Sequence, residues 1–297
     1  MKLKNIKSLG ILLLTAMIWG FAFVAQRVGA EHVGAFTFNG IRFALGAASL
    51  IPVIMIFEKK EKEAVVHSKK MKQTLFVGLV AGIVLFVASW LQQWGIEVTG
   101  SAGKGGFITG LYTVLVPLFG ILLGKKTGLN VWIGAVFAVV GLFLLCITDK
   151  WQLSIGDGIL LIGSVFWAIH ILVIDGFGNR IYSLRFACTQ FVVCAVFSLV
   201  CAFVFECISL GSIKPAVVPI LYGGLMSVGV AYTCQIIGQK NADPTFASII
   251  LSTESMFAAI GGAIILHETM TANGYWGCAL IFIGIILSQI TLKPRKN

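Results

Sequence analysis

Apolar residues fill long, nearly uninterrupted stretches of this chain, and short polar or charged segments separate them. A helix needs about 20 apolar residues to cross the roughly 30 Å hydrocarbon core of a bilayer. Ten stretches meet this requirement: 8–29, 34–57, 74–98, 101–123, 129–148, 157–175, 181–205, 215–238, 244–266 and 273–292. They are continuously apolar and lack the two-residue alternation of a membrane β-barrel. The pattern therefore predicts an all-α integral membrane protein with ten transmembrane helices.

The composition supports this interpretation. The 297 residues are 58% hydrophobic and 11% charged, with a mean hydropathy of +0.96. A soluble protein carries about 25% charged residues, so a soluble globular class is excluded. The seven cysteines form neither an even set nor a C-x-x-C pair. A disulfide framework and a zinc site are therefore not expected, and no cofactor is predicted.

Basic residues are distributed unevenly between the predicted helices. With the N-terminus placed in the cytoplasm, 17 of the 22 Lys and Arg residues fall in cytoplasmic segments, four fall in outer segments, and Arg42 lies within a span. Cytoplasmic loops of membrane proteins carry such an excess. The charges predict a multi-pass protein of the plasma membrane with both termini in the cytoplasm. The net charge of +10 is explained by these membrane flanks and does not indicate a nucleic-acid partner.

The two halves of the chain resemble each other in register, at offsets of 142 to 148 residues. The matched pairs are Gly10 with Gly158, Trp19 with Trp167, Arg42 with Gln190, Trp90 with Tyr232, Gln93 with Gln235, Gly120 with Gly262, Gly134 with Gly277 and Gly141 with Gly284. Their common order favours two repeats, residues 1–149 and 150–297, of five helices each. An odd number of helices inverts the second repeat in the membrane. Inverted repeats are typical of secondary transporters, which bind substrate near the membrane midplane.

Four stretches carry a family resemblance. They are Ile18-Trp19-Gly20, Arg42-Phe43, the run from Thr99 to Pro117, and the run from Thr253 to Ala258 that precedes His267-Glu268. On these stretches the chain resembles the EamA family of the drug/metabolite transporter superfamily over nearly its whole length. The resemblance implies a ten-helix, two-repeat carrier that moves small metabolites, often outward. The chain departs from the family at Lys125-Lys126, where a Gly-Glu pair is common, and the role of that loop stays open.

Two ionisable residues lie near the middle of predicted spans, where a charge is costly and usually functional. Arg42 lies in the second predicted helix and Glu254 in the ninth, at similar expected depths. The two side chains either pair as a structural lock between the halves or hold the opposite charges of a zwitterionic substrate. If transport is coupled to protons, Glu254 is the predicted carrier. Exchange and facilitated diffusion fit the sequence equally well.

Amide and aromatic side chains mark further faces that are expected to point inward, since an unsatisfied amide in hydrocarbon costs roughly 2–7 kcal/mol. Trp19 and Trp167 fall near the midplane, where they either line a cavity or pack helices together. His170 is a weaker candidate. The predicted substrate-binding residues are Trp19, Arg42, Trp90, Gln93, Tyr112, Trp167, Tyr232, Gln235 and Glu254.

Enzyme motifs are not found. The run Gly100 to Gly105 lacks the spacing and the Ser/Thr of a phosphate-binding loop, and His267-Glu268 has no second histidine for a zinc protease helix. The predicted function is a secondary transporter, not an enzyme, that exports a small organic metabolite by alternating access. Arg42 and Glu254 favour an amino acid or a related compound. A multidrug exporter, a sugar or nucleotide-type exchanger and a flippase for lipid-like substrates stay open, as do a monomer and a homodimer.

Overall fold

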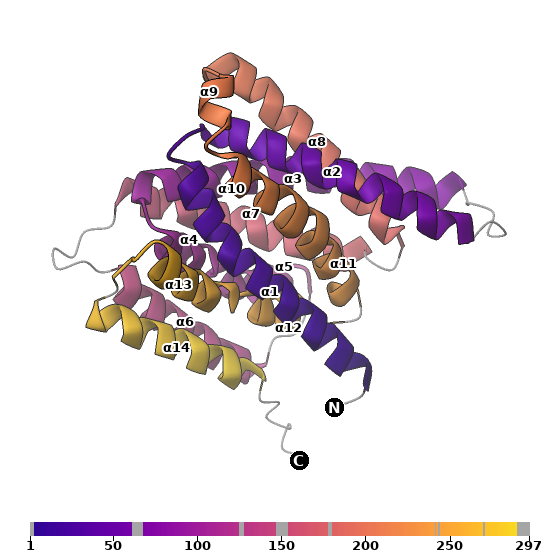
Figure 1. Ribbon diagram of the computed structural model, residues 1–297. Helices are drawn as coiled ribbons and strands as arrows, with labels where there is room; N and C mark the ends of the chain where they lie inside the picture. Colours follow the sequence, from indigo (N-terminus) through magenta and orange to yellow (C-terminus); the bar gives the residue numbers. More distant parts are fainter. Residues whose placement is uncertain are drawn as a thin grey trace, which may run out of the picture.

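The computed structural model describes residues 3–60, 68–124, 128–146, 154–177, 180–240, 242, 244–269 and 271–289. All regular elements of these residues are helices (Figure 1). Several basic residues used for the orientation lie outside the described residues. They are Lys2, Lys62, Lys125, Lys126, Lys150, Lys293, Arg295 and Lys296.

The helices of the first half are α1 (Leu3–Gly29), α2 (Ala35–Lys60), α3 (Ser68–Thr99), α4 (Ala102–Thr109), α5 (Tyr112–Leu122) and α6 (Leu129–Cys146). Those of the second half are α7 (Ile155–Phe177), α8 (Ser183–Phe205), α9 (Leu210–Ile213), α10 (Val217–Leu221), the π-helix η1 (Tyr222–Tyr232), α11 (Thr233–Gln239), α12 (Pro244–Leu251), α13 (Glu254–Ile265) and α14 (Ala272–Gln289). The described part of the chain is therefore all-helical, as predicted.

Eight segments of the described residues are long and apolar enough to cross a bilayer: α1, α2, α3, α4 with α5, α7, α8, α10 to α11, and α12 with α13. The predicted spans 129–148 and 273–292 form α6 and α14, of 18 residues each. The prediction of transmembrane helices is thus confirmed for eight spans and stays a prediction for α6 and α14.

Two of the predicted helices are each interrupted near the middle. The stretch 101–123 is divided at Gly110-Leu111, and the stretch 244–266 is divided at Ser252-Thr253. At both breaks the amide of the second residue, Leu111 or Thr253, bonds to the carbonyl three residues earlier, as in a 3₁₀ turn. The expectation of a continuous helix was wrong here, because such a tight turn does not disturb the apolar pattern. Pro117 lies inside α5, beyond the first break.

The predicted span 215–238 also departs from a regular helix. Its central 11 residues, Tyr222–Tyr232, form the π-helix η1 between two short α-helices. Long π-helices are rare, and π-type turns occur most often at functional sites. Since η1 contributes Ser227 and Tyr232 to the cavity described below, the irregular backbone lies next to that cavity.

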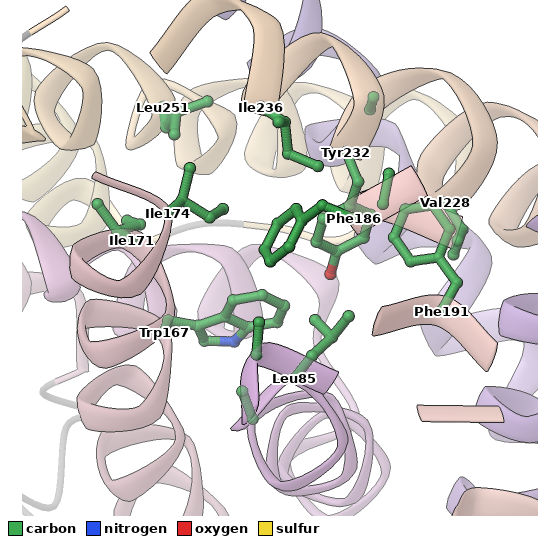
Figure 2. Close-up of a cluster of buried hydrophobic side chains, with 14 of the residues drawn as sticks. Leu85, Trp167, Ile171, Ile174, Phe186, Phe191, Val228, Tyr232, Ile236 and Leu251 are labelled. Carbon is green, nitrogen blue, oxygen red and sulfur yellow. The ribbon is translucent and has the colours of Figure 1, made fainter. Parts of the chain in front are cut away.

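The bundle has two ends that are useful to distinguish (Figure 1). We call the end where α1 begins and α14 ends the terminal end, and the end that carries α9 and the turn between α1 and α2 the α9 end. The largest apolar cluster of the described residues fills part of the interior and includes Leu85, Ile171, Ile174, Phe186 and Leu251, whose side chains are drawn in Figure 2. Large apolar side chains also cover the outside of the bundle, such as Phe203 at 77% exposure, which suits contact with lipid.

The helices α6 and α14 lie against each other at backbone distance. A Cβ atom added to Gly141 would lie 2.5 Å from the carbonyl oxygen of Gly277, and one added to Gly284 would lie 2.6 Å from that of Gly134. Small residues allow this close approach of membrane helices. The four glycines are those that match between the halves of the sequence.

Candidate functional site

A cavity lies among the helices of both halves, and its empty volume of about 410 Å³ includes space open to solvent. Seven of the nine predicted site residues line it: Trp19, Arg42, Tyr112, Trp167, Tyr232, Gln235 and Glu254. The first lining residue of α1 is Trp19 and the last is Gln26, three residues before the helix ends. The cavity therefore extends toward the α9 end, and the apolar cluster bounds it on the other side.

Three aromatic rings from different helices form one wall of the cavity. The ring of Trp19 lies 4.7 Å from that of Tyr232, in an edge-to-face arrangement, and 6.5 Å from that of Trp167. The rings of Trp167 and Tyr232 are stacked at 6.1 Å. The indole N–H of Trp19 donates to the carbonyl of Ser227 at 3.3 Å. Aromatic pairs of this kind add about 0.5–1.5 kcal/mol beyond burial, so the wall is rigid.

Arg42 brings a positive charge to the cavity without a counter-ion. Its Nε donates to Oδ1 of Asn39 at 2.8 Å, and its guanidinium carbon lies 5.5 Å and 4.9 Å from the ring centres of Phe38 and Phe43. The atom Nη2 is buried and has no hydrogen-bond partner in the described part of the chain. The ion pairs found among the described residues do not include Arg42. A buried charge is costly without a partner, so this position can accept an anionic group.

Glu254 brings a negative charge to the same cavity. It is the first residue of α13, directly after the second helix break, and its Oε1 accepts a hydrogen bond from the hydroxyl of Tyr112 at 2.9 Å. Tyr112 is the first residue of α5, directly after the first break. Both breaks thus place the first residue of the following helix at the cavity, where the helix N-terminus favours a carboxylate. The direct ion pair between Arg42 and Glu254, one of two sequence hypotheses, is not formed between these described side chains.

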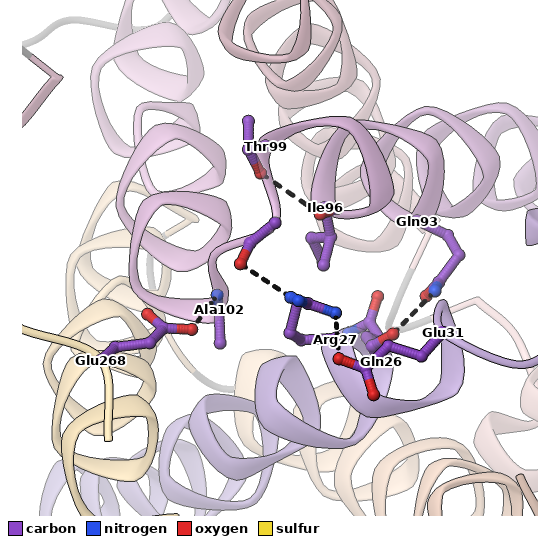
Figure 3. A network of polar contacts seen from close by, with 9 residues as sticks. Gln26, Arg27, Glu31, Gln93, Ile96, Thr99, Ala102 and Glu268 are labelled. Carbon is purple, nitrogen blue, oxygen red and sulfur yellow. Dashed lines mark hydrogen bonds and ion pairs between the residues drawn. The ribbon is translucent and has the colours of Figure 1, made fainter. Parts of the chain in front are cut away.

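Two predicted site residues, Trp90 and Gln93, do not line the cavity. The ring of Trp90 stacks on Phe36 at 5.3 Å and on Trp94 at 5.6 Å. Gln93 is fully buried and donates to the backbone carbonyl of Gln26 at 3.0 Å (Figure 3). In this conformation α3 is rotated so that the preceding residue, Gln92, lines the cavity instead, and a substrate contact of Trp90 and Gln93 stays a prediction.

The structure adds lining residues that the sequence interpretation missed. They are Ala22, Phe23, Gln26, Gln92, Thr109, Ile171 and Ser227. Gln26 could have been found, because it lies seven residues after Trp19 and therefore on the same helical face. Gln92, whose side-chain amide donates to Oε1 of Gln26 at 2.9 Å, could not be distinguished from Gln93 by periodicity.

Carboxylates from the second half cap helices of the first half at the α9 end. Glu268 accepts hydrogen bonds from Ser101 Oγ at 2.8 Å, from the amide of Ala102 at 2.8 Å and from that of Gly103 at 3.2 Å, at the start of α4 (Figure 3). Glu206 accepts bonds of 2.8 Å from the amides of Phe36 and Thr37, at the start of α2.

Further polar contacts lie beside these caps. Arg27 donates from Nε to the carbonyl of Gly100 at 2.7 Å and pairs with Glu31 at 2.8 Å (Figure 3). Lys104 lies 3.6 Å from a carboxylate oxygen of Asp157 in the second half. The α9 end is therefore held by polar contacts between the two halves. The largest apolar cluster packs nearer the terminal end, where polar contacts such as that from the amide of Tyr182 to Oγ1 of Thr74 at 3.1 Å also occur.

Within the described ranges, no group of three or more His, Cys, Asp or Glu side chains is placed to hold a metal ion. The polar groups of the cavity can bind and orient a small molecule by charge and hydrogen bonds.

Comparisons with known proteins agree with this geometry. The sequence model of the EamA-like transporter family matches residues 6–147 and 154–290. The uncharacterized transporter YoaV of Bacillus subtilis is 26% identical over 296 residues, covering 97% of this chain and 98% of the relative. An uncharacterized transporter of Archaeoglobus fulgidus is 25% identical over 287 residues, covering 94% and 84%. A protein of known crystal structure has a TM-score of 0.74 at 18% identity, over 95% of this chain and 96% of that chain, and so shares the fold. The chain belongs to the EamA-like transporter family and is a multi-pass membrane transporter, not an enzyme.

Proposed function

We propose that this protein is a secondary transporter that exports a small zwitterionic metabolite, an amino acid or a related compound, by alternating access. The observation that carries the proposal is that Arg42 and Glu254 line one buried cavity and do not pair with each other. A positive and a negative group that line one site without pairing with each other match the carboxylate and the ammonium of a zwitterion.

Different residues of the cavity can bind different groups of the substrate. The free edge of the Arg42 guanidinium suits a carboxylate, to which arginine forms paired, charge-assisted hydrogen bonds. The carboxylate of Glu254 suits an ammonium group, and the faces of Trp19 and Tyr232 add cation–π attraction of about 0.5–2 kcal/mol. The aromatic wall also offers apolar contact area for a side chain of the substrate.

The alternatives are a multidrug exporter and a flippase for lipid-like substrates. Buried charges disfavour an uncharged apolar drug, which would leave both of them unpaired. A lipid-like substrate would need a cavity open to the side, whereas Arg42, Tyr112 and Glu254 are only 2–3% exposed. These observations favour the small zwitterion.

Alternating access is proposed to rest on ten spans in two inverted repeats, residues 1–149 and 150–297. The pattern of helix packing supports this arrangement, because exchanging the halves reproduces it. Helix α1 packs on α12 and α13 as α7 packs on α4 and α5, and α3 packs on α7 and α8 as η1 packs on α1 and α2. The pairs α2 with α8 and α6 with α14 map onto themselves. Helices α6 and α14 rise about 27 Å each, close to the thickness of the hydrocarbon core.

The two helix breaks support the same proposal at atomic detail. Backbone hydrogen bonds at the first break recur at the second, at an offset of 142 residues. The donor and acceptor pairs are Leu111 to Ile108 and Thr253 to Ile250, Thr113 to Gly110 and Ser255 to Ser252, Val114 to Leu111 and Met256 to Thr253, and Leu115 to Leu111 and Phe257 to Thr253. Interrupted helices in corresponding positions of two repeats are the strongest indication of a transporter binding site.

The proposed location is the plasma membrane, with both termini in the cytoplasm. The start of α1 and the end of α14 lie at the same end of the bundle (Figure 1). Basic residues also belong to elements that start or finish there, such as Lys70 in α3, Arg185 in α8 and Lys240 after α11. This distribution is the one expected for a cytoplasmic face.

Flux measurements in proteoliposomes test the proposal. The purified protein is assayed for uptake and efflux with a mixed metabolite panel, and then with Arg42→Gln and Glu254→Gln. Loss of amino-acid flux in both variants supports the proposal, and unchanged rates in both contradict it. The matched control is Glu31→Gln, which neutralises a carboxylate with 52% side-chain exposure that does not line the cavity.

A pH gradient across the same vesicles separates two coupling modes. Proton coupling through Glu254 predicts that flux follows the gradient and that Glu254→Gln removes this dependence. Exchange predicts that flux ignores the gradient and depends on substrate inside the vesicle.

A further inference from the structure

Several buried polar side chains on the side of the terminal end each have one polar atom without a hydrogen-bond partner among the described residues, although Gln239 Nε2 donates to the carbonyl of Ile171 at 2.9 Å. His170 Nε2 lies 3.0 Å from Gln190 Oε1, but His170 Nδ1, Gln190 Nε2 and Gln239 Oε1 have no hydrogen-bond partner in the part of the chain that the structure describes. All three residues are at most 2% exposed. Each such group costs about 1–3 kcal/mol in a buried setting. A second conformation of the carrier that exposes these atoms to water would provide their missing hydrogen bonds, and this would explain why they are unpaired in the present one.

The repeats of the proposed function identify that second conformation. If the halves exchange conformations during alternating access, each residue that lines the present cavity becomes buried. The residue that matches it in the other half then lines a cavity instead. The offsets of 142 and 148 residues define the counterparts. They are His170 for Ala22, Ile174 for Gln26, Gln190 for Arg42 and Leu251 for Thr109.

All four counterparts are now sealed. His170, Ile174, Gln190 and Leu251 are each at most 1% exposed and do not line the cavity, whereas the residues they match, each 2% exposed, line it. Ile174 and Leu251 belong to the largest apolar cluster, and Figure 2 shows both side chains near Ile171 and Ile236. Separation of this cluster would therefore uncover the unpaired atoms of His170 and Gln190.

From these observations, which rest on the proposed function, we propose that His170, Ile174, Gln190 and Leu251 form the wall of a second cavity that opens to the terminal end. Gln190 and His170 form the polar part of this wall and bind the carboxylate of the same substrate by neutral hydrogen bonds. Charge-assisted hydrogen bonds are about twice as strong as neutral ones. The second cavity therefore holds the carboxylate more weakly than Arg42 does in the present one.

The same exchange assigns a place to Trp90 and Gln93. They match Tyr232 and Gln235, which line the present cavity. In the second conformation Trp90 and Gln93 take over that part of the wall. Their position outside the present cavity is thus the expected consequence of alternation between two states.

Cysteine accessibility tests the second cavity with matched pairs. The seven native cysteines are replaced by Ser or Ala, and single cysteines are introduced as Ile174→Cys with Gln26→Cys, and as Leu251→Cys with Thr109→Cys. A charged, membrane-impermeant methanethiosulfonate reagent is added to one side of sided vesicles. A protease site at a terminal tag reports the orientation.

The expected result is a side-dependent reaction. Gln26→Cys and Thr109→Cys react from the α9 side, and Ile174→Cys and Leu251→Cys react from the terminal side. We call Ile174→Cys and Leu251→Cys the inner cysteines. If the second conformation is populated at 0.1–10%, the inner cysteines react about 10- to 1,000-fold more slowly than an exposed cysteine. Each pair suffices alone, so a variant that fails to fold is replaced by the other pair.

The contradicting results are distinct for this inference and for the proposed function. If the starting protein carries amino-acid flux but neither inner cysteine reacts from the terminal side, the second cavity is wrong and the proposed function stands. If the starting protein carries no flux of any panel compound, the proposed function fails. Reaction of the inner cysteines from the α9 side alone also contradicts the second cavity.

Discussion

Arg42 and Gln190 occupy matching positions in the two halves of the chain, 148 residues apart, but their surroundings differ. Arg42 lines the cavity, supported by Asn39 and two phenylalanine rings, whereas Gln190 is sealed in the apolar interior beside His170. The helix breaks of the two halves, in contrast, share the same backbone hydrogen bonds. The comparison teaches that the two helix breaks share their backbone hydrogen bonds, whereas the charge at this matched position is found in the first half alone. Under the proposed function, the unpaired cation gives the first half the stronger role in substrate binding.

The largest expected effect comes from removing this difference. Arg42→Gln places in the first half the residue that the second half already carries. Hydrogen bonds to a charged group contribute about 1.5–3 kcal/mol, so flux of carboxylate-bearing substrates should fall about 10- to 100-fold. Flux assays in proteoliposomes at subsaturating substrate measure it. Gln190→Leu removes a neutral hydrogen bond and should reduce flux less than Arg42→Gln does. An equal loss of flux in both variants would contradict the difference proposed between the two halves.

The second prediction concerns the shared geometry. Gly141→Ala and Gly284→Ala each drive a Cβ atom against a backbone carbonyl of the facing helix, at 2.5 Å and 2.6 Å. Overpacking costs about 1–3 kcal/mol, and the two variants should lose thermal stability equally. Unfolding temperatures in detergent measure both.

The control for these substitutions is another pair of glycines that match between the two halves, Gly10 and Gly158. A Cβ atom at Gly10 or Gly158 meets nothing within 4 Å. Gly10→Ala and Gly158→Ala should therefore leave the unfolding temperature unchanged or raise it. Strongly unequal effects at Gly141 and Gly284 would contradict the matched packing of α6 and α14.

The third prediction addresses the contact between the two helix breaks. Tyr112→Phe removes one hydrogen bond to Glu254, worth about 0.5–1.5 kcal/mol, so flux should change about 2- to 10-fold. Tyr222→Phe is the control, because it removes a bond to the backbone of Ile18 at 3.0 Å outside the cavity. Flux at several substrate concentrations separates binding from turnover. Identical kinetics of Tyr112→Phe and the parent protein would show that the contact is only structural.

The smallest effect is expected at the α9 end. Arg27 and Glu31 form an exposed pair one helical turn apart. Such pairs contribute about 0.3–0.5 kcal/mol, so Glu31→Gln should scarcely change stability or flux. A large loss of flux would mean that this surface pair takes part in gating, and the contrast between the two ends would need revision.

Much of the fold could be predicted from the sequence, because apolar length alone defines a membrane helix. The breaks at Gly110 and Ser252 could not, since a single tight turn leaves the apolar pattern intact. The π-helix η1 was equally hidden, because its extra residue per turn follows from packing and not from composition.

The candidate site divides in the same way. Arg42, Glu254, Trp19 and Trp167 could be found because a buried charge or indole in a membrane needs a reason. Gln92 and Gln93 could not be ranked, since neighbouring residues on a helix differ by about 100° and only the packing of α3 sets its rotation. The absence of a direct bond between Arg42 and Glu254 depends on the placement of α2 and α13, which local sequence does not encode.

Competition between three related compounds tests the central claim most directly. Counterflow of a transported neutral amino acid is inhibited with the amino acid itself, with its carboxamide and with its N-acetyl derivative, which lack the negative and the positive charge in turn. If Arg42 and Glu254 hold the two charges, each derivative should compete about 10- to 100-fold more weakly than the parent compound. Equal competition by all three compounds would contradict the account.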